Sequence, residues 1–180
     1  VEFSRIKKSS DAEDYLNGSV IVDSEKNEVA CGGDHGLIGG RAWLFSQPEM
    51  DQKLDYLFVD EAGQVSLADI VATGLSAKNI VLVGDQMQLG QPTKGKHPGG
   101  SGVSGLDYLM GEWATVPDDR GVFLEHTWRL HPKLCSFISD AFYDSKLKSA
   151  PCTFGQMLDL ADDLDGTLGP FGLRFVSVDH

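Results

Sequence analysis

The sequence is short of basic residues, and this limits the ligands that the chain binds strongly by itself. Its 180 residues include 15 Lys and Arg against 27 Asp and Glu, which gives a formal net charge of −12. The phosphates of DNA and RNA are bound mainly through Lys and Arg. We therefore expect weak or no binding of nucleic acid by this chain alone, although an acidic balance does not exclude a local basic groove.

Paired cysteines and long apolar runs are also missing. The three cysteines, Cys31, Cys135 and Cys152, are scattered and form no C-x-x-C pair. This pattern favours reduced thiols in a cytoplasmic protein over a disulfide framework or a zinc site. No apolar run is long enough to cross a membrane, and no signal peptide is recognisable. The sequence thus predicts a globular cytoplasmic chain of one or two small domains with no membrane partner.

Two apolar runs that lead into acidic residues are the most informative pattern present. The run 56–59 is followed by Asp60 and Glu61, and the run 79–83 leads to Asp85. Apolar runs of this length predict buried strands. The side chains of two adjacent acids at a strand end point to opposite faces of the sheet, so that one acid can hold a metal while its neighbour faces a water molecule.

The segment between these runs predicts how the strands are joined. Residues 66–72 favour a helix, and a connection of this length suits a right-handed crossover between parallel strands. Parallel strands end on the same edge, where open α/β sheets place their ligands. We therefore expect Asp60, Glu61, Asp85 and Gln88 in one crevice. A pair of acids that caps a helix N-terminus is the alternative interpretation of Asp60 and Glu61.

Shorter patterns predict further elements. Apolar residues favour short strands at 20–22, 39–45, 122–124 and 173–178. Pro132 predicts the start of a helix, because proline is tolerated in the first helical turn.

The segment after this proline has the spacing of an amphipathic helix. Apolar residues recur at offsets 0, 3, 4, 7 and 8, namely Leu134, Phe137, Ile138, Ala141 and Phe142. Such a stripe predicts one buried helix face. We expect Phe137, Phe142 and Tyr143 in the core. Trp43 and Phe45 are also expected there, with stacking on nucleic-acid bases as the alternative.

Two segments are expected to lie outside regular elements. The Gly- and Pro-rich segment 90–105 predicts a loop that is functional or mobile, or that marks a domain boundary. The acidic stretch 158–166 predicts a solvated surface.

Three sequence blocks, taken together, resemble the motifs of a known family. They are VDEAGQ at 59–64, VLVGDQMQL at 81–89 and TWRLHPKLCSFISDAFYDSKL at 127–147. In this order they resemble motifs II, III and IV of the superfamily 1 DNA/RNA helicases. The closest branch is that of the nonsense-mediated-decay helicase and the Okazaki-fragment helicase–nuclease. The G-D-x-x-Q-L core of the second block argues against superfamily 2.

This resemblance implies a fold and a function. The fold is α/β, a RecA-like parallel sheet with flanking helices of the P-loop NTPase type. Residues 1–95 would be the C-terminal part of a first RecA-like domain, and 96–180 the N-terminal part of a second. The parent enzyme would use ATP and Mg²⁺ to move along single-stranded DNA or RNA, and some relatives carry an attached nuclease domain.

The resemblance also implies roles for residues of motifs II and III. Asp60 would hold Mg²⁺, and Glu61 would orient and deprotonate the attacking water. Gln64 would link nucleotide binding to strand binding. Asp85 and Gln88 would bind the nucleotide, with Gln88 as the sensor of the γ-phosphate; a purely structural amide is the alternative for Gln88.

Arg129 of motif IV would contact the γ-phosphate as an arginine finger, which typically contributes about 10³–10⁵ in rate. A surface ion-pair partner is the alternative interpretation of Arg129. The chain departs from the family at three points. Arg41 stands where Thr is usual, Gln86-Met87 replaces Pro-Gln, and Leu130 replaces Met.

Some family motifs have no counterpart in the sequence. No Walker A loop precedes motif II, and the string 90–97 has the form G-x-x-x-x-G-K but ends in His97. A P-loop needs Ser or Thr at that point, followed by a helix. Motifs V and VI are missing as well. We therefore expect a helicase fragment that is inactive alone; a non-enzymatic helicase-derived scaffold or interaction module is the alternative.

Overall fold

The computed structural model describes residues 5–8, 20–90, 95, 98–159 and 169–177. The chain divides into two compact units, Val1–Leu109 and Met110–His180. Helices and short parallel sheets occur in both units, so the chain is α/β. The described strands form three separate small sheets and not one continuous sheet.

The first sheet has three parallel strands in the order β2-β1-β3. They are β1 (Arg5–Lys8), β2 (Val22–Ser24) and β3 (Leu37–Gly39). The strand predicted at 20–22 is therefore displaced toward Ser24. Helix α1 (Asn27–Gly32) connects β2 to β3, as a parallel crossover requires.

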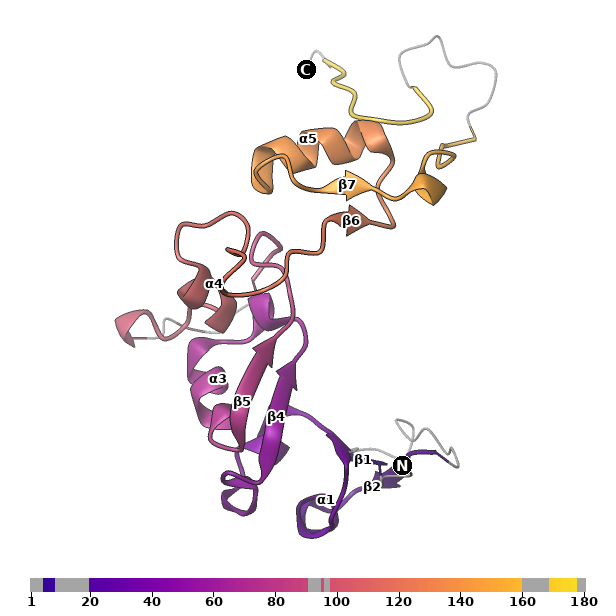
Figure 1. Cartoon of the computed structure of the whole chain (residues 1–180). Coiled ribbons are helices and arrows are strands. Elements are labelled where there is room, and N and C mark those ends of the chain that lie inside the picture. Colours follow the sequence, from indigo (N-terminus) through magenta and orange to yellow (C-terminus); the bar gives the residue numbers. More distant parts are fainter. Residues whose placement is uncertain (1–4, 9–19, 91–94, 96–97, 160–168, 178–180) are drawn as a thin grey trace. The chain divides into compact units, whose positions relative to one another are not determined.

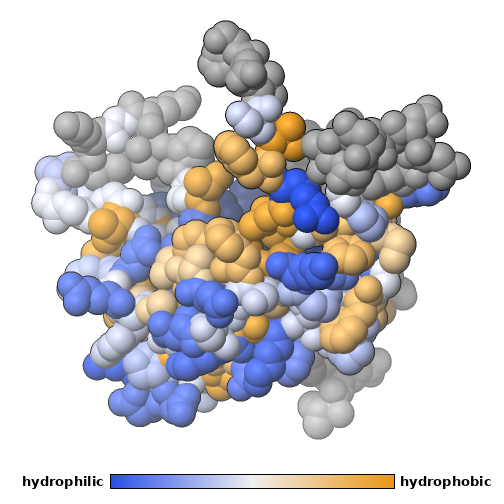
Figure 2. All heavy atoms as spheres, turned by 90° about the horizontal axis from the view of Figure 1, so that it is seen from above, coloured by the Kyte–Doolittle hydropathy of each residue, from blue (hydrophilic) through white to orange (hydrophobic). Residues whose placement is uncertain are grey.

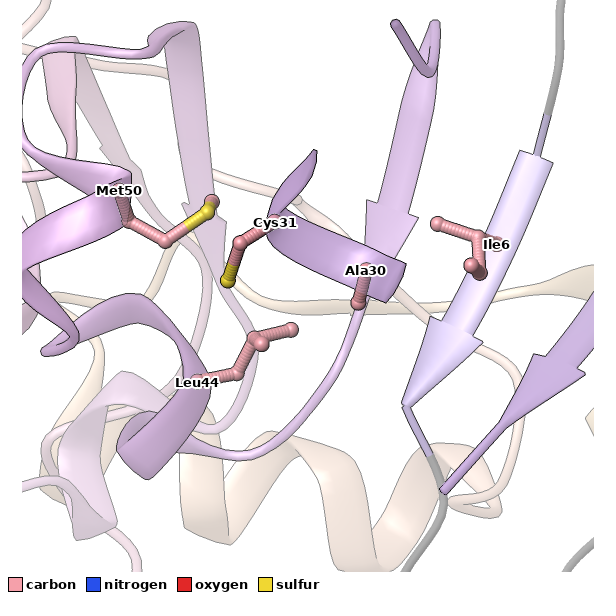
Figure 3. Close-up of a cluster of buried hydrophobic side chains, with 5 residues drawn as sticks. All are labelled: Ile6, Ala30, Cys31, Leu44 and Met50. Atoms are coloured by element: carbon pink, nitrogen blue, oxygen red, sulfur yellow. The ribbon is translucent and has the colours of Figure 1, made fainter. Parts of the chain in front are cut away.

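A small buried cluster holds this part of the first unit together. It consists of Ile6, Ala30, Cys31, Leu44 and Met50 (Figure 3). Leu44 comes from helix α2 (Ala42–Phe45), and Met50 from the 3-10 helix η2 (Pro48–Met50). Burial raises the pKa of the Cys31 thiol above its ordinary value, because the thiolate would lose its hydration.

The strand predicted at 39–45 is wrong over most of its length. Backbone pairing ends at Gly39, and residues 42–45 form helix α2. Four residues are too few for the period of a helix to be distinguished from that of a strand. Trp43 is 80% exposed and not in the core, whereas Phe45 packs against the buried cluster.

The predicted crossover unit is confirmed. Strand β4 (Leu54–Val59) pairs in parallel with β5 (Ala77–Leu82), and α3 (Leu67–Gly74) connects them. Helix α3 lies along one face of the two strands (Figure 1). On that face Leu57 is buried, and the Ile80 side chain lies against Gly74.

The other face of β4 and β5 is open. Tyr56 and Phe58 lie two residues apart on β4 and therefore share this face. Their exposed fractions are 60% and 68%, and their ring centroids are 6.5 Å apart. The prediction of fully buried strands is thus wrong for one face. Figure 2 shows that apolar side chains reach the surface among hydrophilic ones.

Helix α4 (Gly105–Met110) follows the Gly-rich segment, in which the 3-10 helix η4 (Pro98–Gly100) is described. The second unit contains β6 (His126–Thr127), α5 (Pro132–Phe142), β7 (Lys148–Ser149) and the 3-10 helix η5 (Pro151–Thr153). Strands β6 and β7 pair in parallel. No helix in the described ranges is long and apolar enough to span a membrane.

Helix α5 begins at Pro132, as predicted. Its buried residues are Cys135 and Ser139, whereas Phe137 and Phe142 are 54% and 44% exposed. Placing Phe137 and Phe142 in the core was therefore wrong, and Tyr143 is only half-buried. The two-residue strands β6 and β7 are too short to cover the whole apolar stripe.

Two further strand predictions are wrong. Residues 122–124 have no regular structure, and pairing starts only at His126. Residues 173–177 are also irregular, and Val178 lies outside the described residues. Strands form only where a partner strand binds their backbone groups, which local composition does not reveal. Most of the acidic stretch 158–166 lies outside the described residues as well.

Candidate functional site

The carboxyl ends of β4 and β5 lie at the same edge of their sheet. Val59, the last residue of β4, is paired with Leu82, the last residue of β5. The two segments that follow, residues 60–64 and 83–88, therefore leave the sheet side by side. We name them together the strand rim. Asp60, Glu61, Gln64, Asp85 and Gln88 all belong to it.

Backbone hydrogen bonds join the two halves of the strand rim. The Val83 amide donates to the Val59 carbonyl at 2.9 Å, which extends the ladder beyond the last paired residues. The Ala62 amide then donates to the Val83 carbonyl, also at 2.9 Å. Because Ala62 is fully buried, breaking this bond would leave a buried polar group without a partner.

Two glycines allow the halves to approach this closely. A Cβ atom on Gly84 would lie 2.7 Å from the Ala62 nitrogen and 3.1 Å from the Gly63 nitrogen. A Cβ atom on Gly63 would collide with the Asp85 carbonyl oxygen. The sequence analysis did not identify either glycine as part of the site. The available signal was a glycine within each block, next to the acids, where close backbone contact requires the absence of a side chain.

The motif II half of the strand rim is tightly turned. Glu61 has φ 53° and ψ 40°, in the left-handed region that few non-glycine residues adopt. Asp60 Oδ1 accepts the Glu61 amide at 3.0 Å. The Gln64 side-chain amide donates to Glu61 Oε2 at 3.5 Å. All three side chains are exposed, so their functional groups face solvent.

The motif III half is organised by Asp85. Its Oδ1 accepts the Met87 amide at 3.0 Å, and its Oδ2 accepts the Gln88 side-chain amide at 3.1 Å. With both oxygens bound, Asp85 shapes the loop and orients Gln88. The Gln88 side chain is exposed and keeps a second N–H, because a side-chain amide has two donors.

Two helices that follow the strand rim in the chain, α3 and α4, begin with a serine cap. Ser66 accepts the Asp69 amide at 3.1 Å, and Ser104 accepts the Asp107 amide at 2.9 Å. Each serine also donates to the carboxylate of its partner, at 2.8 and 2.7 Å. Both sequences have the S-x-x-D form of a capping motif, a signal that the sequence analysis did not use.

The start of α4 is also bonded to the segment that follows motif II. The Leu67 amide donates to the Val103 carbonyl at 2.8 Å, and the Gly105 amide donates to the Val65 carbonyl at 2.9 Å. Beside Gln64 these segments leave a cavity of about 130 Å³. Ligand pockets are usually about 300–1,000 Å³, so this cavity alone is too small for a nucleotide.

The donor set of the strand rim suits a hydrated divalent cation. Within the described ranges, no group of three or more His, Cys, Asp or Glu side chains gathers to enclose a metal ion. Mg²⁺ keeps several waters and is commonly held by one or two carboxylates together with phosphate oxygens. The exposed carboxylate of Asp60 fits that mode of binding.

Arg129 belongs to the second unit and not to the strand rim. It follows β6, and its amide donates to Thr127 Oγ1 at 3.3 Å. Its side chain is exposed. His131, two residues on, caps α5 by accepting the Lys133 amide on Nδ1 at 3.2 Å. The start of the motif IV block thus forms the turn from a short strand into α5, and the rest of the block contains α5 itself.

Comparison with known proteins finds several curated relatives, of which two are described below, while no protein-family model matches the chain. The chain is 32% identical over 109 residues to the Drosophila melanogaster protein named "Regulator of nonsense transcripts 1 homolog". The aligned residues make up 60% of this chain and 9% of that protein. The chain is also 32% identical over 99 residues to "DNA polymerase alpha-associated DNA helicase A" of Schizosaccharomyces pombe, covering 55% of the chain and 14% of that protein.

The chain therefore spans only a small part of the length of these curated relatives. Both matches agree with the family indicated by the three motif blocks. Over more than half of its length, the chain is similar in sequence to the superfamily 1 helicases.

Proposed function

We propose that this chain is part of an ATP-dependent helicase or translocase that acts on nucleic acid. The observation that supports this most directly is the strand rim. Two parallel strands present Asp60 and Glu61 beside Asp85 and Gln88 at one edge, which is the edge that α/β sheets use for ligands. The similarity to two helicase relatives points to the same chemistry.

In this proposal each residue of motif II has a separate task. Asp60 holds Mg²⁺ through its exposed carboxylate, in part through water. Glu61 accepts the proton of the attacking water, and the Gln64 amide fixes the position of the Glu61 carboxylate. Phosphoryl transfer depends mostly on positioning and on charge stabilisation. The left-handed conformation of Glu61 is the kind of backbone strain that accompanies such positioning.

Motif III and motif IV complete the assignment. Asp85 orients Gln88, and Gln88 donates its remaining N–H to the γ-phosphate. Arg129 contributes a guanidinium group, whose planar fork of donors suits phosphate oxygens better than the single ammonium of Lys. In this proposal residues 1–95 belong to a first RecA-like domain and residues 96–180 to a second, with single-stranded DNA or RNA as the partner of the parent protein.

ATP hydrolysis by the protein whose coding sequence contains this chain tests the proposal. We expect turnover that single-stranded nucleic acid stimulates. Glu61→Gln should lower kcat by about 10²–10⁴, the usual contribution of a general base. Arg129→Ala should lower it by about 10³–10⁵. Glu112→Gln, at an exposed position outside the strand rim, is the matched control and should keep normal turnover.

Two results would contradict the proposal in different ways. Normal turnover by Glu61→Gln would remove Glu61 from the chemistry. No hydrolysis by the parent protein under any condition would favour the scaffold alternative. The 180-residue chain alone should show negligible turnover, because it lacks the Walker A amides and lysine that bind most of the phosphate.

A further inference from the structure

The second unit contains a groove with an unusual set of side chains. Its volume is about 410 Å³, within the usual range for ligand pockets. Helix α5 and the segment 171–174 form its walls, and its lining residues are Lys133, Ser136, Phe137, Phe171, Gly172, Leu173 and Arg174. Two of these are cations, two are aromatic, and none is acidic. We name it the α5 groove.

The charge of the α5 groove is opposite to that of the chain. Asp and Glu outnumber Lys and Arg by 27 to 15 in the sequence, yet none of the described residues that line this groove is acidic. Lys133 lines it from α5, and Arg174 lines it from the segment 171–174. Two cations in one groove attract an anion, and no described residue that lines the groove carries an opposing charge.

The aromatic residues are arranged so that Phe137 is the one exposed to a ligand. Phe171 is stacked on the His131 ring, with centroids 4.4 Å apart and an interplanar angle of 15°. The Lys133 ammonium lies 4.8 Å from the Phe171 ring centroid. Phe171 therefore serves to position Lys133. Phe137 remains 54% exposed and offers its surface to a planar group.

The backbone of the second wall is shaped for this arrangement. Gly172 has φ 87°, which only glycine adopts readily, and it lies against the Lys133 side chain. The Arg174 guanidinium lies over Gly169, where a Cβ atom would collide with it.

We infer that the α5 groove binds a nucleoside phosphate, with the phosphate between Lys133 and Arg174 and the base against Phe137. Ser136 offers a hydroxyl as a further phosphate donor. Cations with an interleaved aromatic side chain are the recurring means of binding single-stranded nucleic acid. The same chemistry serves a nucleotide unit of a strand and a free nucleotide. This inference does not rest on the proposed motor function, because the groove shares no residue with the strand rim.

Binding of two probes by the 180-residue chain tests the inference. One probe is a fluorescein-labelled oligothymidylate of about ten nucleotides, followed by fluorescence anisotropy. The other is thymidine 5′-monophosphate, followed by backbone amide shifts in NMR. We expect the oligonucleotide to bind weakly. The logarithm of its association constant should fall linearly with the logarithm of the salt concentration, with a slope of about −1.4, the value for two phosphate contacts on a single strand. Amide shifts should concentrate at Lys133 and at residues 171–174.

Substitutions inside and outside the α5 groove show which residues bind the oligonucleotide. The double variant Lys133→Ala/Arg174→Ala should bind the oligonucleotide about tenfold more weakly and lose most of the salt slope, since both phosphate contacts are gone. Lys78→Ala/Lys148→Ala removes the same charge at two positions that do not line the groove, and should change affinity less than about twofold. Lys133→Arg keeps the charge and should keep the affinity. Phe137→Ala should weaken binding about fivefold or more through lost stacking.

Each outcome decides the inference. It is supported if the double variant loses binding and the charge-matched control does not. If the monophosphate and the oligonucleotide bind with equal affinity per site, and the variants change both affinities alike, the ligand is a free nucleotide. If the oligonucleotide binds more tightly than the monophosphate, the ligand is a nucleic-acid strand. The inference is overturned if neither probe binds at millimolar concentration, or if both double variants lose affinity equally. All substituted residues are exposed, and circular dichroism checks that each variant is folded.

Discussion

The strand rim and helix α5 contain blocks of the same motif set, yet they are held in different ways. Backbone hydrogen bonds and two glycine contacts fix the strand rim, while the side chains of Asp60 and Glu61 face solvent. Helix α5 is held by its cap and by two small buried side chains, Cys135 and Ser139. A site fixed by backbone contacts is sensitive to one added methyl group. A helix held by few side chains tolerates truncation of its exposed ones.

Among substitutions in the strand rim and on helix α5, the largest loss of stability should follow from adding a methyl group to the strand rim. Gly84→Ala places a Cβ atom against the backbone of residues 61–63, and overpacking of this kind costs about 1–3 kcal/mol. Urea unfolding measures the loss. Gly90→Ala, which has open space around its Cβ position, is the control and should stay within about 0.5 kcal/mol. Equal stability of both variants would show that the two halves of the strand rim separate easily.

A second substitution tests the backbone strain in the strand rim. Glu61 is left-handed, and this conformation costs an L-residue about 1–2 kcal/mol. We therefore expect Glu61→Gly to be more stable than Glu61→Ala by about 1 kcal/mol, the reverse of the order in a helix. Thermal unfolding of the two variants side by side gives the difference. If Ala proves more stable than Gly, residue 61 does not hold this conformation in solution.

On helix α5 the expected effect is smaller. Phe137 is about half exposed, so Phe137→Ala should cost less than about 1 kcal/mol, compared with about 3–5 kcal/mol for a buried phenylalanine. Leu44→Ala, in the buried cluster, is the positive control and should cost about 2–5 kcal/mol. A loss at Phe137 as large as that at Leu44 would mean that another surface covers this helix face in solution.

The smallest effect concerns an exposed ion pair at the end of the sheet opposite the strand rim. Lys78 Nζ lies 2.8 Å from Asp55 Oδ1, and this hydrogen bond, together with the lysine charge, lowers the pKa of the Asp55 carboxyl. A lowered pKa means that the folded state favours the charged carboxylate, so the ion pair stabilises the fold at pH values above the ordinary carboxyl pKa. This contribution is lost as the pH falls through the lowered pKa of Asp55. In Lys78→Ala the Asp55 pKa should rise toward its ordinary value. NMR titration of the Asp55 carboxyl carbon measures the change, and an unchanged pKa would show that the pair does not persist in solution.

The crossover unit could be predicted from the sequence because its patterns are long. Strands β4 and β5 have six residues each, and α3 has eight. Each is long enough for its period to be recognised. The acids could be placed at one edge because parallel strands must end together.

Several shorter elements could not be predicted, for the opposite reason. Strands β6 and β7 have two residues each, and α2 has four. Elements this short exist only through their partners. The same limit applies to burial, because Phe137 fits an amphipathic stripe whether or not another element covers it. The roles of Gly63 and Gly84 also depend on contacts between distant backbone segments, which no local pattern shows.

The open face of β4 and β5 has a practical consequence for handling this polypeptide. Within the described ranges the two strands have no further neighbours in their sheet, and Tyr56 and Phe58 are exposed on it. Unpaired strand edges beside apolar rings are templates for association between molecules. Purified material should therefore cluster as its concentration rises, and dilute samples at low temperature are the right starting point for spectroscopy.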